Sequence, residues 1–397
     1  MDTSVQANRS GADPAWLGGL PRKDLYVIPL IAVVTFLLML AIAVGCELLA
    51  RRHMPALSGF ACLAEDEADG ISHGLPGCTG EGQAAGAPRV EYSFNECGYR
   101  NLAAGCGPLP AGVRRIAIIG ASFAEGWPVA VQNSFAGILE PTLSKLCDKP
   151  VEVENLGAVG NDIAGAYREM DETQRLKASV VILSILPTDL YTPNLHQHVL
   201  ARNESIAPQR QKAAGNLIRQ LIDSGALTPR LVKVIRDFSY RDTDYYVKTY
   251  LRMSDKSDYL RVPFTPMWEQ RLADLDLLLG EMTDRLRHSG AQLALLFAPA
   301  RAQAAILGHP ARFPGTDAHA LSRRLQQITD RHGVLLIDAT SNFATHSDPE
   351  QLYFAVDGHP NESGQSVIAG SIVTSLTTAP GSPFLDCAGT GTARAPQ

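Results

Sequence analysis

Four short segments of the 397-residue chain carry polar side chains that can take part in catalysis, and three of them also contain glycines. They are 120–126, 155–162, 186–189 and 357–364. The first contains Ser122 on a glycine-flanked turn, and the last contains Asp357 and His359. A histidine that accepts the serine proton, oriented by a carboxylate, makes a serine nucleophilic at neutral pH. Each segment alone is weak evidence, because a Gly-x-Ser turn is most often a helix N-cap.

Five apolar runs alternate with helical patterns and would carry these segments to one edge of a sheet. The runs expected as strands are 115–120, 151–156, 179–185, 292–297 and 334–338; helical patterns occupy 134–146, 162–176, 267–288, 319–332 and 362–376. Near-continuous apolar strands separated by helices predict a parallel α/β sheet covered on both faces. Ligands of such sheets bind beyond the carboxyl ends of the strands, where the first three polar segments follow.

The predicted α/β domain covers residues 113–378 and is interrupted at 191–265. This interruption is polar, has helical patches, and is predicted to be a helical insertion over the edge of the sheet. It contains a cluster of tyrosines, at 240, 245, 246 and 250. We expect these rings to pack the insertion onto the domain rather than to contact substrate.

Together the polar segments resemble the SGNH (GDSL-type) hydrolase superfamily, whose fold is a flavodoxin-like three-layer α/β/α sandwich. Residues 120–122 resemble its first block, with alanine where the name-giving aspartate usually stands. Residues 155–160 look like the second block, and residues 357–361 resemble the terminal block that carries the catalytic Asp and His. Residues 94–100 also resemble a segment that precedes this domain in membrane-anchored bacterial members.

The resemblance implies a role for each matching residue. Ser122 would be the nucleophile, His359 the general base, and Asp357 the group that orients the histidine. The backbone N–H groups of Ser122 and Gly160 would bind the oxyanion.

Two departures from the family pattern affect this assignment. Thr188-Asp189 stands where the third block normally reads Asn-Asp, and its Asn donates to the oxyanion. A Thr hydroxyl is shorter than an amide, and losing one oxyanion donor costs roughly 10²–10³ in rate. Activity is then reduced unless another donor serves. One residue separates Asp357 from His359 where two are usual, so either the pair still touches or His359 uses a backbone carbonyl instead.

These assignments predict an extracytoplasmic serine esterase or acylhydrolase acting on ester-linked acyl groups of envelope glycans or lipids. Two alternatives stay open: a polysaccharide O-acyltransferase with the same acyl-enzyme chemistry, and a catalytically impaired binding or assembly protein, which Thr188 favours. No cofactor and no metal site are expected, because neither metal-ligand spacing nor a phosphate-binding glycine loop occurs. A net charge of −6 without a basic excess argues against nucleic-acid binding.

An uncharged apolar stretch, Leu25–Cys46, precedes the domain. As a helix its 22 residues would span roughly 33 Å, about one bilayer core, and signal-peptide cores are shorter. We therefore predict a single-pass transmembrane helix at 25–49 in the inner (cytoplasmic) membrane, with residues 1–24 cytosolic and the C-terminal domain periplasmic. Residues 43–46 also resemble a weak lipoprotein box, so cleavage that leaves a lipidated Cys46 is the alternative.

Six cysteines follow the span, an even number that suits an oxidising compartment. Six allow 15 pairings, so sequence does not settle the pattern. Local pairs Cys62–Cys78 and Cys97–Cys106 would close short loops and would leave Cys147 for Cys387; six free thiols are the alternative. Residues 50–112 are expected to form a stalk and irregular lead-in, and residues 379–397 a loose tail, pinned if Cys387 is bonded.

Overall fold

The computed structural model describes residues 16–17, 20–21, 24–53, 62–65, 72–102, 107–191 and 230–389. The chain divides into two compact units, one containing residues 1–55 and 217–235 and the other containing residues 56–216 and 236–397. A short antiparallel pair, β1 (Trp16–Leu17) and β2 (Leu20–Pro21), belongs to the first unit. The parallel sheet and every candidate site residue belong to the second.

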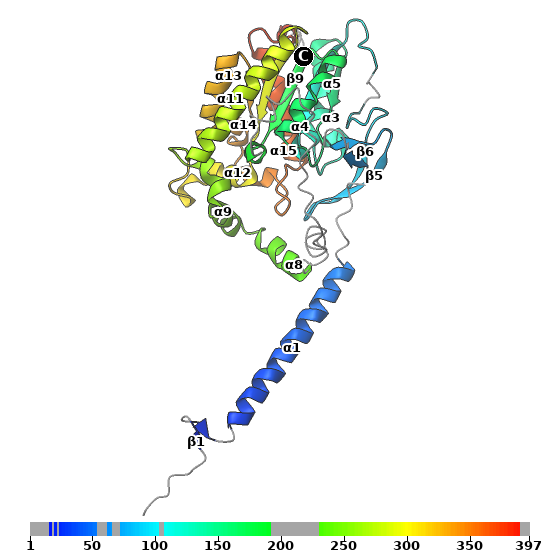
Figure 1. The fold of residues 1–397 in the computed structure, drawn as a ribbon. Helices are drawn as coiled ribbons and strands as arrows, with labels where there is room; N and C mark the ends of the chain where they lie inside the picture. Colours follow the sequence, from blue (N-terminus) through cyan, green and yellow to red (C-terminus); the bar gives the residue numbers. More distant parts are fainter. Residues whose placement is uncertain are drawn as a thin grey trace, which may run out of the picture. The chain divides into compact units, whose positions relative to one another are not determined.

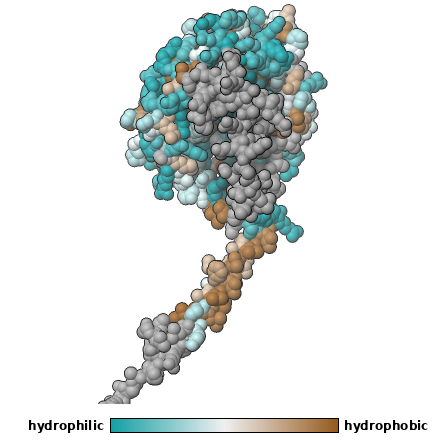
Figure 2. All heavy atoms as spheres, viewed as in Figure 1, coloured by the Kyte–Doolittle hydropathy of each residue, from teal (hydrophilic) through white to brown (hydrophobic). Residues whose placement is uncertain are grey.

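The helix α1 (Asp24–His53) carries no charged residue from Leu25 to Cys46, and Figure 2 shows hydrophobic side chains along it. Residues Tyr26–Arg52 have a mean hydropathy of 3.0 over their most apolar window, and none of that window is buried in the protein. By length and composition α1 is a candidate membrane span. It extends to His53, past the predicted end at residue 49, and near this end Glu47 and Arg51 form an ion pair one turn apart at 2.7 Å.

Five parallel strands form the central sheet of the second unit (Figure 1). They are β7 (Arg114–Gly120), β8 (Val151–Asn155), β9 (Val180–Ile185), β10 (Gln292–Phe297) and β11 (Leu335–Asp338). Each lies where the sequence predicts a strand. Their order across the sheet is β11-β10-β9-β7-β8, so the first strand lies between the second and the third. This is the flavodoxin-like order, and the predicted fold class is confirmed.

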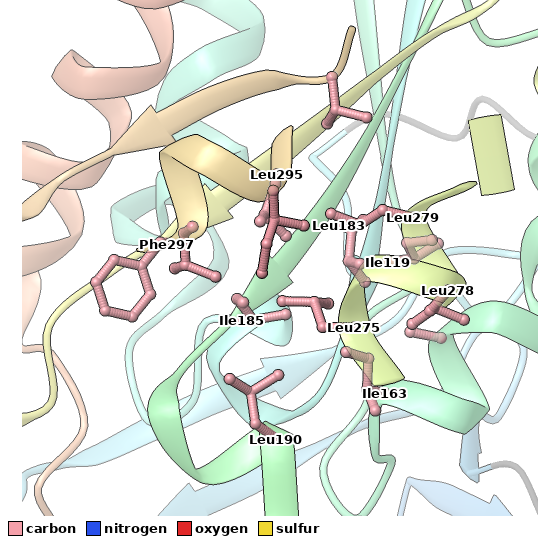
Figure 3. Close-up of a cluster of buried hydrophobic side chains, with 14 of the residues drawn as sticks. Ile119, Ile163, Leu183, Ile185, Leu190, Leu275, Leu278, Leu279, Leu295 and Phe297 are labelled. Carbon is pink, nitrogen blue, oxygen red and sulfur yellow. The ribbon is translucent and has the colours of Figure 1, made fainter. Parts of the chain in front are cut away.

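Alternate residues of the central strands point to opposite faces, and both faces are buried. On one face, shown in Figure 3, the strand residues Ile119, Leu183, Ile185, Leu295 and Phe297 pack against helix residues such as Leu275 and Leu278. On the other face, Ile116, Ile118, Val180, Ile182 and Leu296 pack against Phe135, Leu139, Ile368 and Ile372. Burial on both sides explains why the strands are apolar runs rather than alternating patterns.

Helices cover the two faces as separate layers (Figure 1). One layer contains α4 (Ile163–Arg168), α5 (Met170–Arg175), α11 (Pro266–Arg287) and α13 (Ala320–His332); the other contains α3 (Phe135–Cys147) and α15 (Glu362–Thr378). The predicted helix at 162–176 is divided at Glu169, although the backbone hydrogen bonds continue through that turn. The helices α12 (Arg301–Gly308) and α14 (Thr340–Phe343) were not predicted.

Part of the predicted insertion, 192–229, lies outside the described residues. Its remainder forms α8 (Arg230–Ser239), α9 (Thr243–Leu251) and α10 (Ser254–Ser257), followed by the 3-10 turn η3 (Asp258–Leu260). Tyr246 and Tyr250 pack against the main hydrophobic core. These two rings therefore join the insertion to the domain, as the sequence led us to expect.

The described residues of the lead-in include short β-strands, where the sequence predicted an irregular segment. It contains two antiparallel pairs, β3 (Leu63–Glu65) with β4 (Ser72–Gly74) and β5 (Thr79–Gln83) with β6 (Arg89–Ser93). A disulfide joins Cys62 to Cys78, as predicted. Five buried residues of the lead-in pack together with Trp127 of the α/β domain and form a small separate core. The five are Cys62, Ala84, Ala87, Tyr92 and Phe94.

The C-terminal segment is fastened to the domain as far as Gly389. Phe384 is fully buried, and a disulfide joins Cys387 to Cys147, the predicted partner, at the end of α3. An ion pair of 2.5 Å between Arg114 and Asp386 lies beside it and lowers the pKa of Asp386 to about 2. Cys97 is also disulfide-bonded, while its predicted partner Cys106 lies outside the described residues.

Loss of the Cys147–Cys387 disulfide should destabilise the domain strongly, because the bond closes a loop across 240 residues. Crosslinks over loops this long reduce the entropy of the unfolded chain and typically contribute about 2–5 kcal/mol. We expect the double variant Cys147→Ser/Cys387→Ser of the full chain to unfold at least about 5 °C lower in differential scanning calorimetry. An unchanged unfolding temperature would contradict this.

Candidate active site

Ser122 lies immediately beyond the carboxyl end of β7, as the first residue of the short helix α2 (Ser122–Glu125). The turn is closed by backbone hydrogen bonds from Glu125 N to Ala121 O and from Trp127 N to Ser122 O, both of 3.1 Å. Because β7 pairs with β8 on one side and β9 on the other, the chain changes direction across the sheet here. Such a switch point is where ligands bind in doubly wound sheets.

His359 and Asp357 lie on a compact loop before α15. Phe354 N donates to His359 O at 2.9 Å, and Gly358 N donates to Phe354 O at 2.8 Å. The side chain of Asn361 accepts from Gly364 N at 3.1 Å and so caps α15 directly after the loop. These bonds hold the His359 backbone in place at the start of a long packed helix.

The three side chains form a connected chain of hydrogen bonds. Ser122 Oγ lies 2.8 Å from His359 Nε2, and His359 Nδ1 lies 2.6 Å from Asp357 Oδ1. Ser122, His359 and Asp357 are all half-buried. This is the arrangement in which a histidine can take the serine proton while a carboxylate orients the ring.

Gly358 explains how one intervening residue is enough between Asp357 and His359. Its φ of +86° is a left-handed backbone conformation that side-chain-bearing residues rarely adopt. The turn brings the Asp357 carboxylate back onto both the ring and the backbone N–H of His359, the latter at 3.3 Å. Of the two outcomes left open by the sequence, the structure therefore has contact between the acid and the histidine.

Gly160, Thr188 and Asp189, the residues expected around the oxyanion, differ in their exposure and in their hydrogen bonds. Gly160 is exposed on the loop after β8, and Thr188 is exposed on the 3-10 turn η2 (Pro187–Tyr191) after β9. No hydrogen bond joins the Thr188 side chain to Ser122 or His359 in the described structure. The role predicted for Gly160 and Thr188 thus stays a prediction.

Asp189 has a structural task on the same turn. Its carboxylate accepts a hydrogen bond from Leu186 N at 2.7 Å and so closes η2. Burial of the carboxylate raises the pKa of Asp189 to about 6, against the opposing effects of that hydrogen bond and of the charge on His359.

The sequence pattern of the GDSL-like Lipase/Acylhydrolase family matches residues 118–367, more than half of the chain. The chain belongs to this family. The matched range contains Ser122, Asp357 and His359 together with all but the start of the sheet, and its description supports ester-hydrolase chemistry.

Several solved structures are similar to this chain. One is TesA, with 12% identity and a TM-score of 0.38, and the match covers 66% of this chain and 98% of that one. A lipase/acylhydrolase from Enterococcus faecalis has 14% identity and a TM-score of 0.37, with 66% and 95% coverage. The esterase EstA from Pseudoalteromonas sp. has 12% identity and a TM-score of 0.35, with 66% and 97% coverage. A search of curated proteins gave no significant match.

The sequence analysis did not identify the buried ionisable residues that lie near the catalytic side chains. Glu125 and Arg100 are fully buried close to the Ser122 turn. Arg301 is buried as well, where it pairs with Glu350 and donates to Ala355 O on the loop before Asp357. A single charged residue inside an otherwise apolar segment, such as Glu125 in 123–127, was the available signal. Among the described residues no group of three or more potential metal ligands occurs.

Replacement of Gly358 by alanine should disturb the acid–histidine contact. A Cβ there meets no atom within 4 Å, so any effect comes from the positive φ rather than from a clash. We expect Gly358→Ala to lower kcat at least tenfold while costing roughly 1 kcal/mol of stability. Ester hydrolysis and urea unfolding measure the two effects. As a control, Gly370→Ala on the exposed face of α15, also without a neighbour within 4 Å, should leave kcat within twofold.

Proposed function

We propose that this protein is an extracytoplasmic serine esterase or acylhydrolase that uses Ser122, His359 and Asp357. The observation that carries the proposal is the hydrogen-bonded series Ser122 Oγ–His359 Nε2, 2.8 Å, and His359 Nδ1–Asp357 Oδ1, 2.6 Å. Membership in an acylhydrolase family gives the same reaction class.

The reaction has two halves. Ser122 Oγ attacks the ester carbonyl while its proton passes to His359 Nε2, and Asp357 stabilises the resulting imidazolium. Collapse of the tetrahedral intermediate breaks the bond to the alcohol, which leaves with the proton from His359. Water then attacks the acyl-enzyme while His359 takes its proton. Collapse of the second tetrahedral intermediate breaks the acyl–Oγ bond, His359 returns the proton to Ser122 Oγ, and the carboxylic acid is released.

The oxyanion would be bound by backbone N–H groups of Ser122 and Gly160. Both belong to loops that follow neighbouring strands, β7 and β8, at the same end of the sheet. The hydroxyl of Thr188, on the exposed turn after β9, would be the third donor once substrate is bound. Preorganised donors of this kind stabilise the negative charge as it develops.

The proposed substrates are ester-linked acyl groups of envelope glycans or lipids. The support is the apolar helix α1, which would keep the domain at a membrane surface where such esters lie. The disulfides Cys62–Cys78 and Cys147–Cys387 support an oxidising compartment, since cytosolic thiols are normally kept reduced.

Removal of the Ser122 hydroxyl tests the chemistry. We expect Ser122→Ala to lower p-nitrophenyl acetate hydrolysis by at least about 10⁴-fold and to abolish labelling by a fluorophosphonate probe, read by mass at residue 122. Ser366→Ala, an exposed serine of α15, is the matched control and should retain full rate and labelling. Equal rates for wild type and Ser122→Ala would rule out the mechanism. Acyl-glycan products formed with a glycan acceptor would indicate transfer instead of hydrolysis.

The location is tested by protease access in spheroplasts of a Gram-negative host that express the full chain. A C-terminal epitope should be digested by added protease while a cytosolic marker stays intact, because the domain would face away from the cytosol. Intact mass distinguishes an uncleaved α1 from a chain that begins at a lipidated Cys46. Protection of the epitope until the membrane is lysed would contradict the proposed orientation.

A further inference from the structure

The loop that carries Gly160 is held on one side by the lead-in strand β4. Ser72 N donates to Asn161 Oδ1 at 2.8 Å, and Asn161 Nδ2 donates to Ser72 O at 3.3 Å. Asn161 directly follows Gly160 in the chain. This two-way pair therefore fixes the loop immediately after the glycine to a strand that lies 89 residues earlier in the sequence.

The same loop is held on its other side by Glu125. Its Oε2 accepts a hydrogen bond from Val159 N at 2.6 Å, and Val159 directly precedes Gly160. Its Oε1 is hydrogen-bonded to the hydroxyl of Tyr92 on the lead-in strand β6. Glu125 also belongs to α2, three residues after Ser122, so one carboxyl group links the nucleophile turn, the Gly160 loop and the lead-in.

Close packing leaves this arrangement little freedom. Glu125 and Tyr92 are almost fully buried, and Trp127 contacts the Tyr92 ring edge-on with centroids 5.5 Å apart. A Cβ placed on Gly157 would lie 2.7 Å from Glu125 N, so the loop backbone runs directly against α2. A displacement of the lead-in would therefore be transmitted to the loop.

A buried arginine of the lead-in holds the nucleophile turn itself. Arg100 donates to Glu125 O at 2.8 Å and to Val129 O, and its guanidinium lies 4.1 Å from the centre of the Tyr92 ring. Burial lowers the pKa of Arg100 to about 9. The two carbonyl oxygens and the ring face replace part of the water that this buried guanidinium would otherwise bind.

We propose that Ser72 and Tyr92, two residues of the lead-in, help to build the esterase site by positioning the Gly160 N–H, Ser72 through Asn161 on one side and Tyr92 through Glu125 on the other. Asn161 and Glu125 are positioning residues, since neither would touch the substrate. The inference rests on the proposed function, and it adds to the site a segment that precedes residues 118–367, the range matched by the family.

The physical reason is the narrow geometry that an oxyanion donor requires. A donor must lie about 2.7–3.1 Å from the developing negative charge, and losing one donor costs roughly 10²–10³ in rate. Gly160 is on an exposed loop, and its neighbours on both sides are held from outside the loop. Removing the hydrogen bond that holds Val159 or the one that holds Asn161 should weaken transition-state binding more than substrate binding. It should therefore lower kcat more than it raises KM.

Asn161→Ala in the full-length protein is the first test. Asn161 is half-buried at the surface, so the variant should fold, with an unfolding temperature within a few degrees of wild type. We expect kcat for p-nitrophenyl acetate to fall at least tenfold and KM to change less than twofold. The matched control is Glu81→Gln, which removes only an exposed pair with Arg89 on the β5–β6 hairpin and should leave kcat unchanged.

Glu125 supplies the second test. Burial raises the pKa of its carboxyl well above the usual value, so a neutral amide is a close substitute that still accepts from Val159 N. We expect Glu125→Ala to lose at least tenfold in kcat and Glu125→Gln to restore most of the rate. Tyr92→Phe, which removes only the hydroxyl, should give an intermediate loss.

The outcomes separate this inference from the proposed function. If wild type cleaves the ester, Ser122→Ala does not, and Asn161→Ala and Tyr92→Phe keep kcat within twofold, the enzyme stands and the positioning role of the lead-in is wrong. If Ser122→Ala cleaves as fast as wild type, the proposed function itself fails. If Glu125→Ala does not fold, Asn161→Ala and Tyr92→Phe decide the matter.

Discussion

The hydrogen bond between Ser122 Oγ and His359 Nε2 is the contact on which the site depends. It joins residues 237 positions apart in the chain, so it exists only when the first strand and the last helix are both packed on the sheet. The nucleophile turn follows β7, an inner strand of the sheet, and the histidine loop precedes α15, which packs against α3 on one face. Folding of the whole α/β domain is therefore a requirement for the chemistry.

Ionisable groups buried beneath this contact make the site costly to assemble. Glu125, Arg100 and Arg301 are shielded from water, and a buried polar group without a hydrogen-bond partner costs free energy. Each is satisfied in part by backbone: Glu125 by Val159 N, and the two arginines by carbonyl oxygens. Because those backbone groups belong to the loops around Ser122, Gly160 and Asp357, the hydrogen bonds that satisfy the buried groups also fix the loops.

The lead-in takes part in this arrangement although composition suggested an irregular stalk. Its strands are short, and it buries Tyr92 and Phe94 only with the help of Trp127 from the α/β domain. Local pattern could not reveal that dependence, because the partner lies outside the segment. The same holds for Asn161, whose side chain is an ordinary loop residue until Ser72 is brought beside it.

Sequence alone was sufficient for the features that local chemistry determines. Apolar runs and helical spacing predicted the five strands and most helices, the uncharged stretch predicted α1, and the order of Ser122, Asp357 and His359 along the chain pointed to the family. Tertiary structure decided whether Asp357 reaches His359, which Gly358 permits through its positive φ, and which buried groups hold the Gly160 loop. Both depend on distances between segments remote in sequence, and residue types and spacing do not set those distances.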